Sequence, residues 1–167
     1  MAFRPTLLAR DWLITTEHYL SAQAGAAVLQ DGGNAVDAAM AAILVEGLVN
    51  PHMHTLGGEI VMLHADGKSG AVKVLNGNTV APQGLTLERC RAAGLDKLVP
   101  EHPFAWGVPA VPGAIAAALA AWGSRRFADV AAPALDLARQ GFPMHPGLRG
   151  PGESLSIAGD AEKFRAR

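Results

Sequence analysis

Two long runs of small apolar residues, interrupted by polar ones, dominate the first third of the chain. Residues 21–33 and 34–51 carry alanine, leucine and valine at helical spacing and predict two consecutive helices. Ser21 and Asn34 stand where an N-cap side chain accepts a backbone hydrogen bond. Asp37 falls in the first turn of the second helix, where the helix dipole favours an anion. The many alanines predict that other elements approach these helices closely.

Strand-like patterns are fewer. The β-branched residues that end the segment 11–16 predict a short strand there. Residues 59–76 predict two strands joined by a tight turn at Asp66-Gly67. The first of these strands, IVMLHA at 60–65, is almost continuously apolar, which is typical of a sheet covered on both faces.

The second half of the chain is mostly helical. Three further helices are predicted, over 86–94 with Thr86 as N-cap, over 112–124, and over 127–142, where Pro133 either kinks the helix or marks its first turns. A connector rich in proline and glycine at 99–113 separates the first from the second. These elements make a mixed α/β layer whose small sheet would leave unpaired edges. The pattern therefore indicates part of a larger fold.

Composition indicates a packed core with apolar surface left over. The 167 residues suffice for one domain. Half of them are hydrophobic but 5% are aromatic, which favours close packing of small side chains. The mean hydropathy of +0.19 is high for a lone soluble domain, so some apolar surface is expected to be buried against something absent from this chain. An isolated chain is therefore expected to form a homo-oligomer.

Charge and cysteine content exclude several classes of protein. The 14 basic and 15 acidic residues are scattered, so nothing supports binding to nucleic acid. The longest apolar run, 35–49, contains two acidic residues and falls short of the about 20 residues of a membrane span, so no membrane partner is expected. The N-terminal residues 1–13 are too interrupted for a secretory signal. A lone Cys90 excludes an internal disulfide and fits a reducing, cytoplasmic compartment.

The histidines at 50–67 raise the question of a metal site. His52, His54 and His64 match no standard zinc spacing, and Cys90 has no partner cysteine, so no metal is expected. Loop histidines with local hydrogen bonds are the favoured interpretation. A role for His52 or His54 in lining a pocket stays open.

A glycine pair and two threonines are the other candidates for chemistry. Gly57-Gly58 allows positive φ and close approach of the backbone to a ligand, and a plain tight turn fits equally well. The pair lacks the Lys-Ser/Thr ending of a phosphate loop and precedes a strand, so no nucleotide site is expected. Thr15 and Thr16 are internal, and neither has the free N-terminal amine that would activate a threonine nucleophile.

Five segments, taken together and in order, resemble the γ-glutamyltransferase (γ-glutamyltranspeptidase) family. They are TTEHYLSAQAGAAVLQDGGNAVDAAMAA at 15–42, NPHMHTLGGEIVML at 50–63, VAP at 80–82, GVPAVPGAIAAALAAWG at 107–123 and FADVAAPALDLARQGFPM at 127–144. The GGNAVDAA and GVPAVPG motifs are the most specific of these. The similarity extends from about Thr15 to His145.

The resemblance implies an α/β fold of the N-terminal-nucleophile hydrolase class, an αββα sandwich of which this chain would hold a helix-rich part with a small sheet. Members are made as precursors that cleave themselves, and the new N-terminal threonine of the second subunit passes an acyl group to water or an amine without a metal or organic cofactor. Residues 1–150 are similar to the N-terminal part of the first subunit, and 151–167 are a polar tail. This chain therefore holds no candidate catalytic residue and needs a C-terminal, nucleophile-bearing subunit.

The resemblance also places a substrate site. Family members carry an arginine that pairs with the α-carboxylate of the γ-glutamyl group, and the matching position here is Asn78. Asparagine is neutral and short, so a small amide other than a γ-glutamyl compound is the expected substrate alongside the γ-glutamyl class. The segment with Gly57, Gly58, His54 and Glu59 is expected to form the floor of the pocket.

Two alternatives from other classes remain. The chain would be a non-catalytic interaction module or remnant if no nucleophile-bearing part exists. It would be one subunit of a two-gene enzyme if that part is a separate polypeptide.

Overall fold

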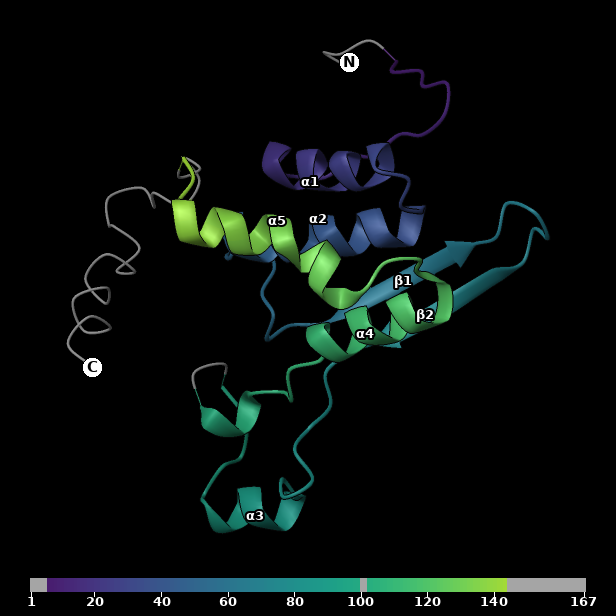
Figure 1. The fold of residues 1–167 in the computed structure, drawn as a ribbon. Helices are drawn as coiled ribbons and strands as arrows, with labels where there is room; N and C mark the ends of the chain where they lie inside the picture. The colour runs from purple at the N-terminus through teal and green to yellow at the C-terminus, as the bar shows by residue number, and fades with distance from the viewer. Residues whose placement is uncertain (1–5, 100–101, 144–167) are drawn as a thin grey trace.

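The computed structural model describes residues 6–99 and 102–143, so the predicted polar tail at 151–167 lies outside the described residues. Within these ranges the chain forms helices and one antiparallel hairpin (Figure 1). The elements are α1 Tyr19–Gln30, α2 Ala35–Val49, β1 Ile60–Ala65, β2 Val72–Gly77, α3 Leu87–Ala92, a 3₁₀ turn Pro103–Ala105, α4 Val111–Trp122 and α5 Phe127–Gln140. None of the helices in these ranges is long and apolar enough to cross a membrane.

The first helix begins two residues earlier than predicted. His18 is its N-cap, and the Nδ1 atom of His18 accepts a hydrogen bond from the Leu20 N–H at 3.2 Å. The prediction of Ser21 as the cap was therefore wrong, and Ser21 is buried inside the first turn instead. The helix ends at Gln30, and Gly32, just past the C-cap Asp31, has a φ of +80°, which residues other than glycine rarely adopt.

The second helix has the predicted cap. The Oδ1 atom of Asn34 accepts hydrogen bonds from the Val36 and Asp37 N–H groups at 2.9 and 3.0 Å. The Asp37 carboxylate in turn accepts the Asn34 N–H at 2.9 Å, which completes a capping box. These bonds satisfy backbone donors that a helix start would otherwise leave free.

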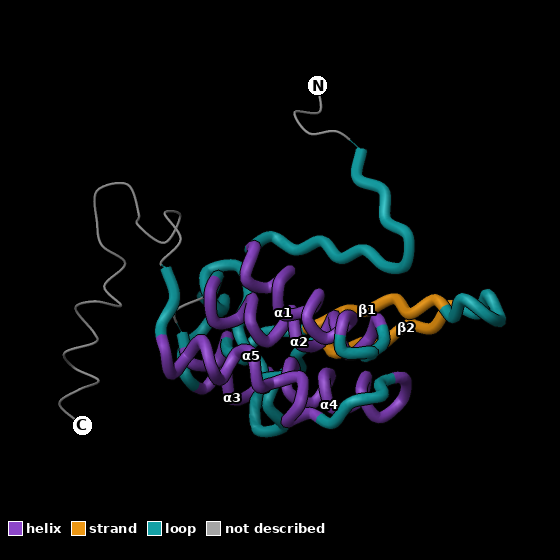
Figure 2. Tube along the Cα trace, turned by 45° about the horizontal axis from the view of Figure 1, so that its top comes forward, coloured by secondary structure: helices purple, strands orange, loops and turns teal. Residues whose placement is uncertain are grey.

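The core lies around α2, which Figures 1 and 2 show next to α1 and α5. α1 packs on one side of α2, α5 on another, and α4 contacts both α2 and the hairpin. The fully buried side chains with the largest volumes include Met40, Val45, Ile115 and Val130. α1 approaches α2 so closely that a Cβ atom on Gly25 would lie 3.0 Å from the Ala38 carbonyl oxygen, which explains the small residues of the sequence.

The hairpin matches the prediction in its position and its turn. β1 and β2 pair from Ile60 opposite Gly77 to Ala65 opposite Val72. The Oδ1 atom of Asp66 accepts the Lys68 N–H at 2.8 Å and closes the turn. The tip of the hairpin projects beyond the helices in both views (Figures 1 and 2).

Only one face of this hairpin is covered within the described residues. The inner face lies on α4, and His64 stacks on Trp122 with ring centroids 4.8 Å apart. The outer face exposes four large apolar side chains, those of Val61, Leu63, Val72 and Val74. Within the described residues β1 therefore alternates between less and more exposed positions, and cover on both faces stays a prediction for the larger fold.

The strand predicted over 11–16 is also absent from the described part. These residues are extended but have no ladder partner among 6–99 and 102–143. A strand needs a neighbouring backbone to complete its hydrogen bonds, and sequence propensity alone does not supply one.

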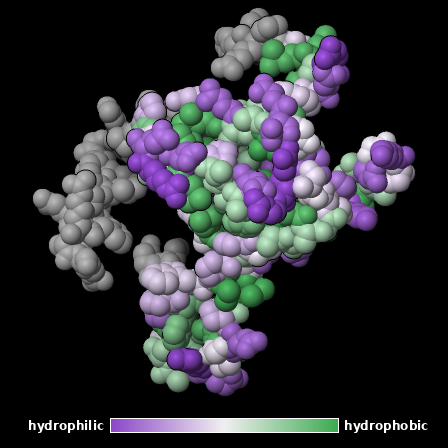
Figure 3. All heavy atoms as spheres, in the orientation of Figure 1, coloured by the Kyte–Doolittle hydropathy of each residue, from purple (hydrophilic) through white to green (hydrophobic). Residues whose placement is uncertain are grey.

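The last three predicted helices are confirmed. Thr86 caps α3, accepting the Arg89 N–H at 3.3 Å, and α3 with the 3₁₀ turn protrudes from the helical layers (Figure 1). α5 continues through Pro133 from Phe127 to Gln140. Apolar residues reach the surface in several places over these layers (Figure 3).

Candidate functional site

The hairpin opens where its two strands leave the ladder, and a third segment joins them there. The register ends at Ile60 opposite Gly77. Beyond this pair the Gly58 carbonyl accepts the Ala110 N–H at 3.1 Å, and the Val80 carbonyl accepts the Val108 N–H at 2.9 Å. We call this meeting point of residues 57–59, 78–80 and 107–110 the fork. The sequence motif GVPAVPG supplies its third arm.

Asn78 lies on the second arm of the fork. Its backbone N–H donates to the Oδ1 atom of Asn76 at 3.2 Å, and the residue is exposed. Asn78 follows Gly77 and Glu59 precedes Ile60, the two residues of the last pair in the register. The structure thus brings two of the predicted site residues together.

Glu59 binds the residue next to Asn78. Its Oε2 atom accepts hydrogen bonds from the N–H and the Oγ1 of Thr79, at 3.4 and 3.3 Å. The carboxylate therefore ties the first arm of the fork to the second.

The glycine pair forms a turn without unusual backbone angles. The Gly58 N–H donates to the Thr55 carbonyl at 3.0 Å. Among the described residues, the glycines with positive φ are Gly32, Gly70, Gly94 and Gly141, so Gly57 and Gly58 do not need glycine for that reason. What the pair provides is a backbone free of side chains at the mouth of the fork.

His54 is oriented toward α2 rather than toward Asn78. Its ring lies against Gly47, where an added Cβ atom would come within 3.3 Å of the His54 Cδ2. Burial lowers the pKa of His54, and the nearby Glu46 carboxylate offsets part of this effect. His54 lines a cavity of about 240 Å³ together with Thr16, Glu46 and Met53. His54 therefore lies on a different surface from the other four predicted site residues, which lie at the fork.

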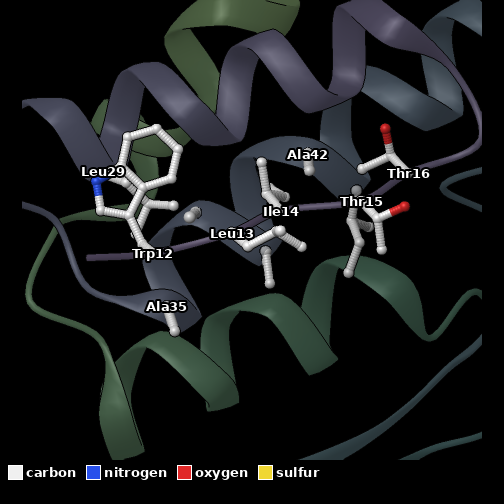
Figure 4. Close-up of a pocket in the computed structure, with 11 residues that line it drawn as sticks. Trp12, Leu13, Ile14, Thr15, Thr16, Leu29, Ala35 and Ala42 are labelled. Atoms are coloured by element: carbon white, nitrogen blue, oxygen red, sulfur yellow. The ribbon is translucent and has the colours of Figure 1, made fainter. Parts of the chain in front are cut away.

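Among the described residues no three His, Cys, Asp or Glu side chains converge as metal ligands. The Thr16 hydroxyl donates to the His18 carbonyl at 2.7 Å, a local bond that ends the extended segment. Thr15 and Thr16 line an apolar cavity of about 370 Å³ between this segment and α1 and α2, in which Trp12 lies beside Leu29 and Ile14 lies near Ala42 (Figure 4).

Sequence reasoning missed two residues of the fork, Thr79 and Gly107. A Cβ atom on Gly107 would lie 2.8 Å from the Thr79 Cβ, closer than real contacts allow, so this position requires glycine. The first glycine of GVPAVPG was a signal that could have pointed to a close approach. Nothing in the sequence indicated Thr79 as the partner.

The arrangement resembles known proteins in both sequence and structure. A sequence model of the gamma-glutamyltranspeptidase family matches residues 21–155. The glutathione hydrolase proenzyme of Bacillus subtilis (strain 168) is 32% identical over 145 residues, which cover 82% of this chain and 24% of that protein. Cephalosporin acylase from Bacillus halodurans superposes with a TM-score of 0.75 at 28% identity, over 99% of this chain and 32% of that one.

The γ-glutamyltranspeptidase of Helicobacter pylori superposes with a TM-score of 0.79 at 23% identity, over 98% of this chain and 46% of that one, which shows the fold alone. The fold class is therefore the predicted one, the α/β fold of N-terminal-nucleophile hydrolases, present here as a helix-rich part with a small sheet. The chain belongs to the γ-glutamyltranspeptidase family. It spans about a quarter of the length of the curated relatives it matches.

Proposed function

We propose that this chain forms the substrate-binding front part of an autoprocessing amide hydrolase. A threonine at the N-terminus of a second, C-terminal part would attack the amide, and its own amine would act as the base. The acyl group would then pass to water or an amine. The observation that carries the proposal is the family match over residues 21–155, which includes the segments that build the fork.

The incomplete surfaces of the chain support a nucleophile-bearing partner. Residues 12–16 are extended without a ladder partner in the described structure, and both outer edges of the hairpin are open. Open edges and an exposed apolar sheet face are costly to leave in water. The second part of the enzyme is the proposed cover. Homo-oligomerisation and a cytoplasmic location stay proposals that rest on composition and on the single Cys90.

Asn78 supports a substrate other than a γ-glutamyl compound. It is exposed at the fork, and its amide has no charge with which to pair an α-carboxylate. The similarity to cephalosporin acylase agrees with an amide substrate outside the γ-glutamyl class. We propose small amides without an α-carboxylate as the preferred class.

The experiment is a substrate comparison on the complete enzyme. Wild type and Asn78→Arg are assayed with a γ-glutamyl anilide and with anilides of short, uncharged acyl groups. We expect wild type to favour the uncharged acyl groups, and Asn78→Arg to raise kcat/KM for the γ-glutamyl anilide by about tenfold or more, as a new charged hydrogen bond provides. The proposal on Asn78 is wrong if the substitution leaves γ-glutamyl hydrolysis unchanged. The proposal of an amide hydrolase is wrong if the complete protein neither cleaves itself nor hydrolyses any anilide.

A further inference from the structure

We infer that Glu59 is a positioning residue, which fixes Asn78 through Thr79 and does not itself contact the substrate. The part of this inference that concerns the substrate rests on the proposed function. The part that concerns the hydrogen bonds between Glu59 and Thr79 does not. The starting observation is that one Glu59 oxygen accepts two hydrogen bonds from a single residue, Thr79.

The need for such a side chain follows from where the ladder ends. Past Gly77, the carbonyl of Gly58 is taken by the Ala110 N–H and no longer faces β2. The Thr79 N–H therefore loses the Gly58 carbonyl that a continued hairpin would offer, while the Asn78 N–H lies on the open side of the strand, where β1 offers no backbone acceptor. Both are instead satisfied by side chains, those of Asn76 and Glu59.

The two bonds hold the backbone of Asn78 on both sides. The Asn78 N–H is held by Asn76 at 3.2 Å, and the next N–H along the chain, that of Thr79, is held by Glu59 at 3.4 Å. The Asn78 side chain is left exposed between these two anchors. A backbone fixed at both ends limits the directions in which the side chain can point, and preorganisation of this kind improves binding.

Gly107, on the third arm of the fork, lies against Thr79. Its missing Cβ atom leaves room for Thr79, since an added Cβ would lie 2.8 Å from the Thr79 Cβ and 2.9 Å from its Oγ1. A side chain there would displace Thr79, which carries both donors to the Glu59 carboxylate. Thr79 is thus held between a glycine on the third arm and a carboxylate on the first.

The first experiment does not depend on catalytic activity. Hydrogen exchange of the Thr79 amide is measured in the complete protein and in Glu59→Ala, with Glu88→Ala on α3 as the matched control for removing an exposed glutamate. We expect Glu59→Ala to speed exchange of this amide by about threefold to tenfold, as loss of one solvent-accessible hydrogen bond predicts. Glu88→Ala should leave it unchanged. An unaltered Thr79 amide in Glu59→Ala overturns the inference.

The second experiment distinguishes a positioning role of Glu59 from direct contact with the substrate. In the complete enzyme, Glu59→Ala should raise KM by about threefold to tenfold with little change in kcat. Thr79→Val should raise KM in the same way. Thr79→Ser keeps the hydroxyl and should have the KM of wild type. In an Asn78→Ala background, Glu59→Ala should have no further effect on KM. If Glu59→Ala raises KM in the Asn78→Ala background as much as it does in wild type, Glu59 acts on the substrate directly and the inference is wrong.

Two glycine variants complete the design. Gly107→Ala should reproduce the KM and exchange effects of Glu59→Ala, because it displaces Thr79. Gly113→Ala on α4 is its control, since an added Cβ there has no neighbour within 4 Å. Equal KM values and equal Thr79 exchange rates in the two glycine variants would contradict the role given to the contact between Gly107 and Thr79. If the complete protein hydrolyses no amide, the proposed function fails, while the Thr79 exchange rates still decide the role of Glu59.

Discussion

Two carboxylates tie distant parts of this chain together, and they do so in opposite environments. Asp37 is fully buried and accepts hydrogen bonds from the Asn34 N–H, the Ser124 N–H and hydroxyl, and the Arg125 N–H, at 2.5 to 3.0 Å. Glu59 is exposed and accepts two bonds at 3.3 and 3.4 Å from Thr79. The first carboxylate joins the start of α2 to the loop between α4 and α5, and the second joins two arms of the fork.

The difference separates what this chain completes by itself from what it leaves open. A buried carboxylate is stable only when its oxygens are satisfied, and Asp37 is satisfied entirely by this chain. Around the fork, backbone groups depend on an exposed side chain, and the sheet beside it has open edges. The helical part is therefore expected to carry the stability, and the fork is expected to be completed by contacts with the proposed substrate and the proposed second part.

Asp37→Asn is expected to have the largest effect. The amide removes the charge and replaces one acceptor oxygen by a donor that faces the Ser124 donors, so roughly 3 kcal/mol of unfolding free energy should be lost. Urea unfolding measures the change. Asp129→Asn is the control, because that carboxylate also caps a helix and pairs with Arg126 but lies on the surface. Its cost should stay below about 1 kcal/mol. Equal losses of unfolding free energy in the two variants would contradict the expected difference between a buried and an exposed carboxylate.

The contrast also explains which parts of the fold could be predicted. Caps, turns and apolar periodicity are local signals, and they located α2 with Asn34, the Asp66 turn and the Thr86 cap. The bonds from Ser124 to Asp37 span 87 residues, and no local pattern encodes them. The segment 11–16 has strand composition, but a strand also needs a partner backbone, which composition does not provide.

The site was predictable to the same extent. Resemblance pointed to Asn78, Glu59 and the glycine pair, which do meet at the fork. His54 was included because it is near them in sequence, but a turn directs its ring toward Gly47. Thr79 was missed because its role depends on where the ladder ends, which only the three-dimensional register shows. Whether these residues touch a substrate stays a prediction.

The pH dependence of stability should sharpen the contrast. Burial raises the pKa of Asp37, but the hydrogen bonds from Ser124, Asn34 and Arg125 outweigh it, so the pKa is lowered overall. A carboxylate with a lowered folded pKa stabilises the protein above its unfolded pKa of about 3.9, and this contribution is lost as the pH falls below that value. The difference in unfolding free energy between wild type and Asp37→Asn should therefore be constant from pH 7 to about 5 and shrink toward pH 3. A difference that does not change with pH would show that the charge of Asp37 is not what stabilises the loop.

The smallest effect on this chain is expected at the outer face of the hairpin. Leu63 is 72% exposed, so Leu63→Lys removes little buried surface and should change the unfolding free energy of the isolated chain by less than about 0.5 kcal/mol. The inward Ile60, which is 8% exposed, is the matched control, and Ile60→Ala should cost about 2 to 4 kcal/mol. In the complete enzyme the order should change, because a lysine at position 63 would be buried without a partner wherever the second part covers this face. Leu63→Lys that assembles and turns over like wild type would mean that the apolar face stays open in the enzyme, and that the incomplete region is confined to the fork.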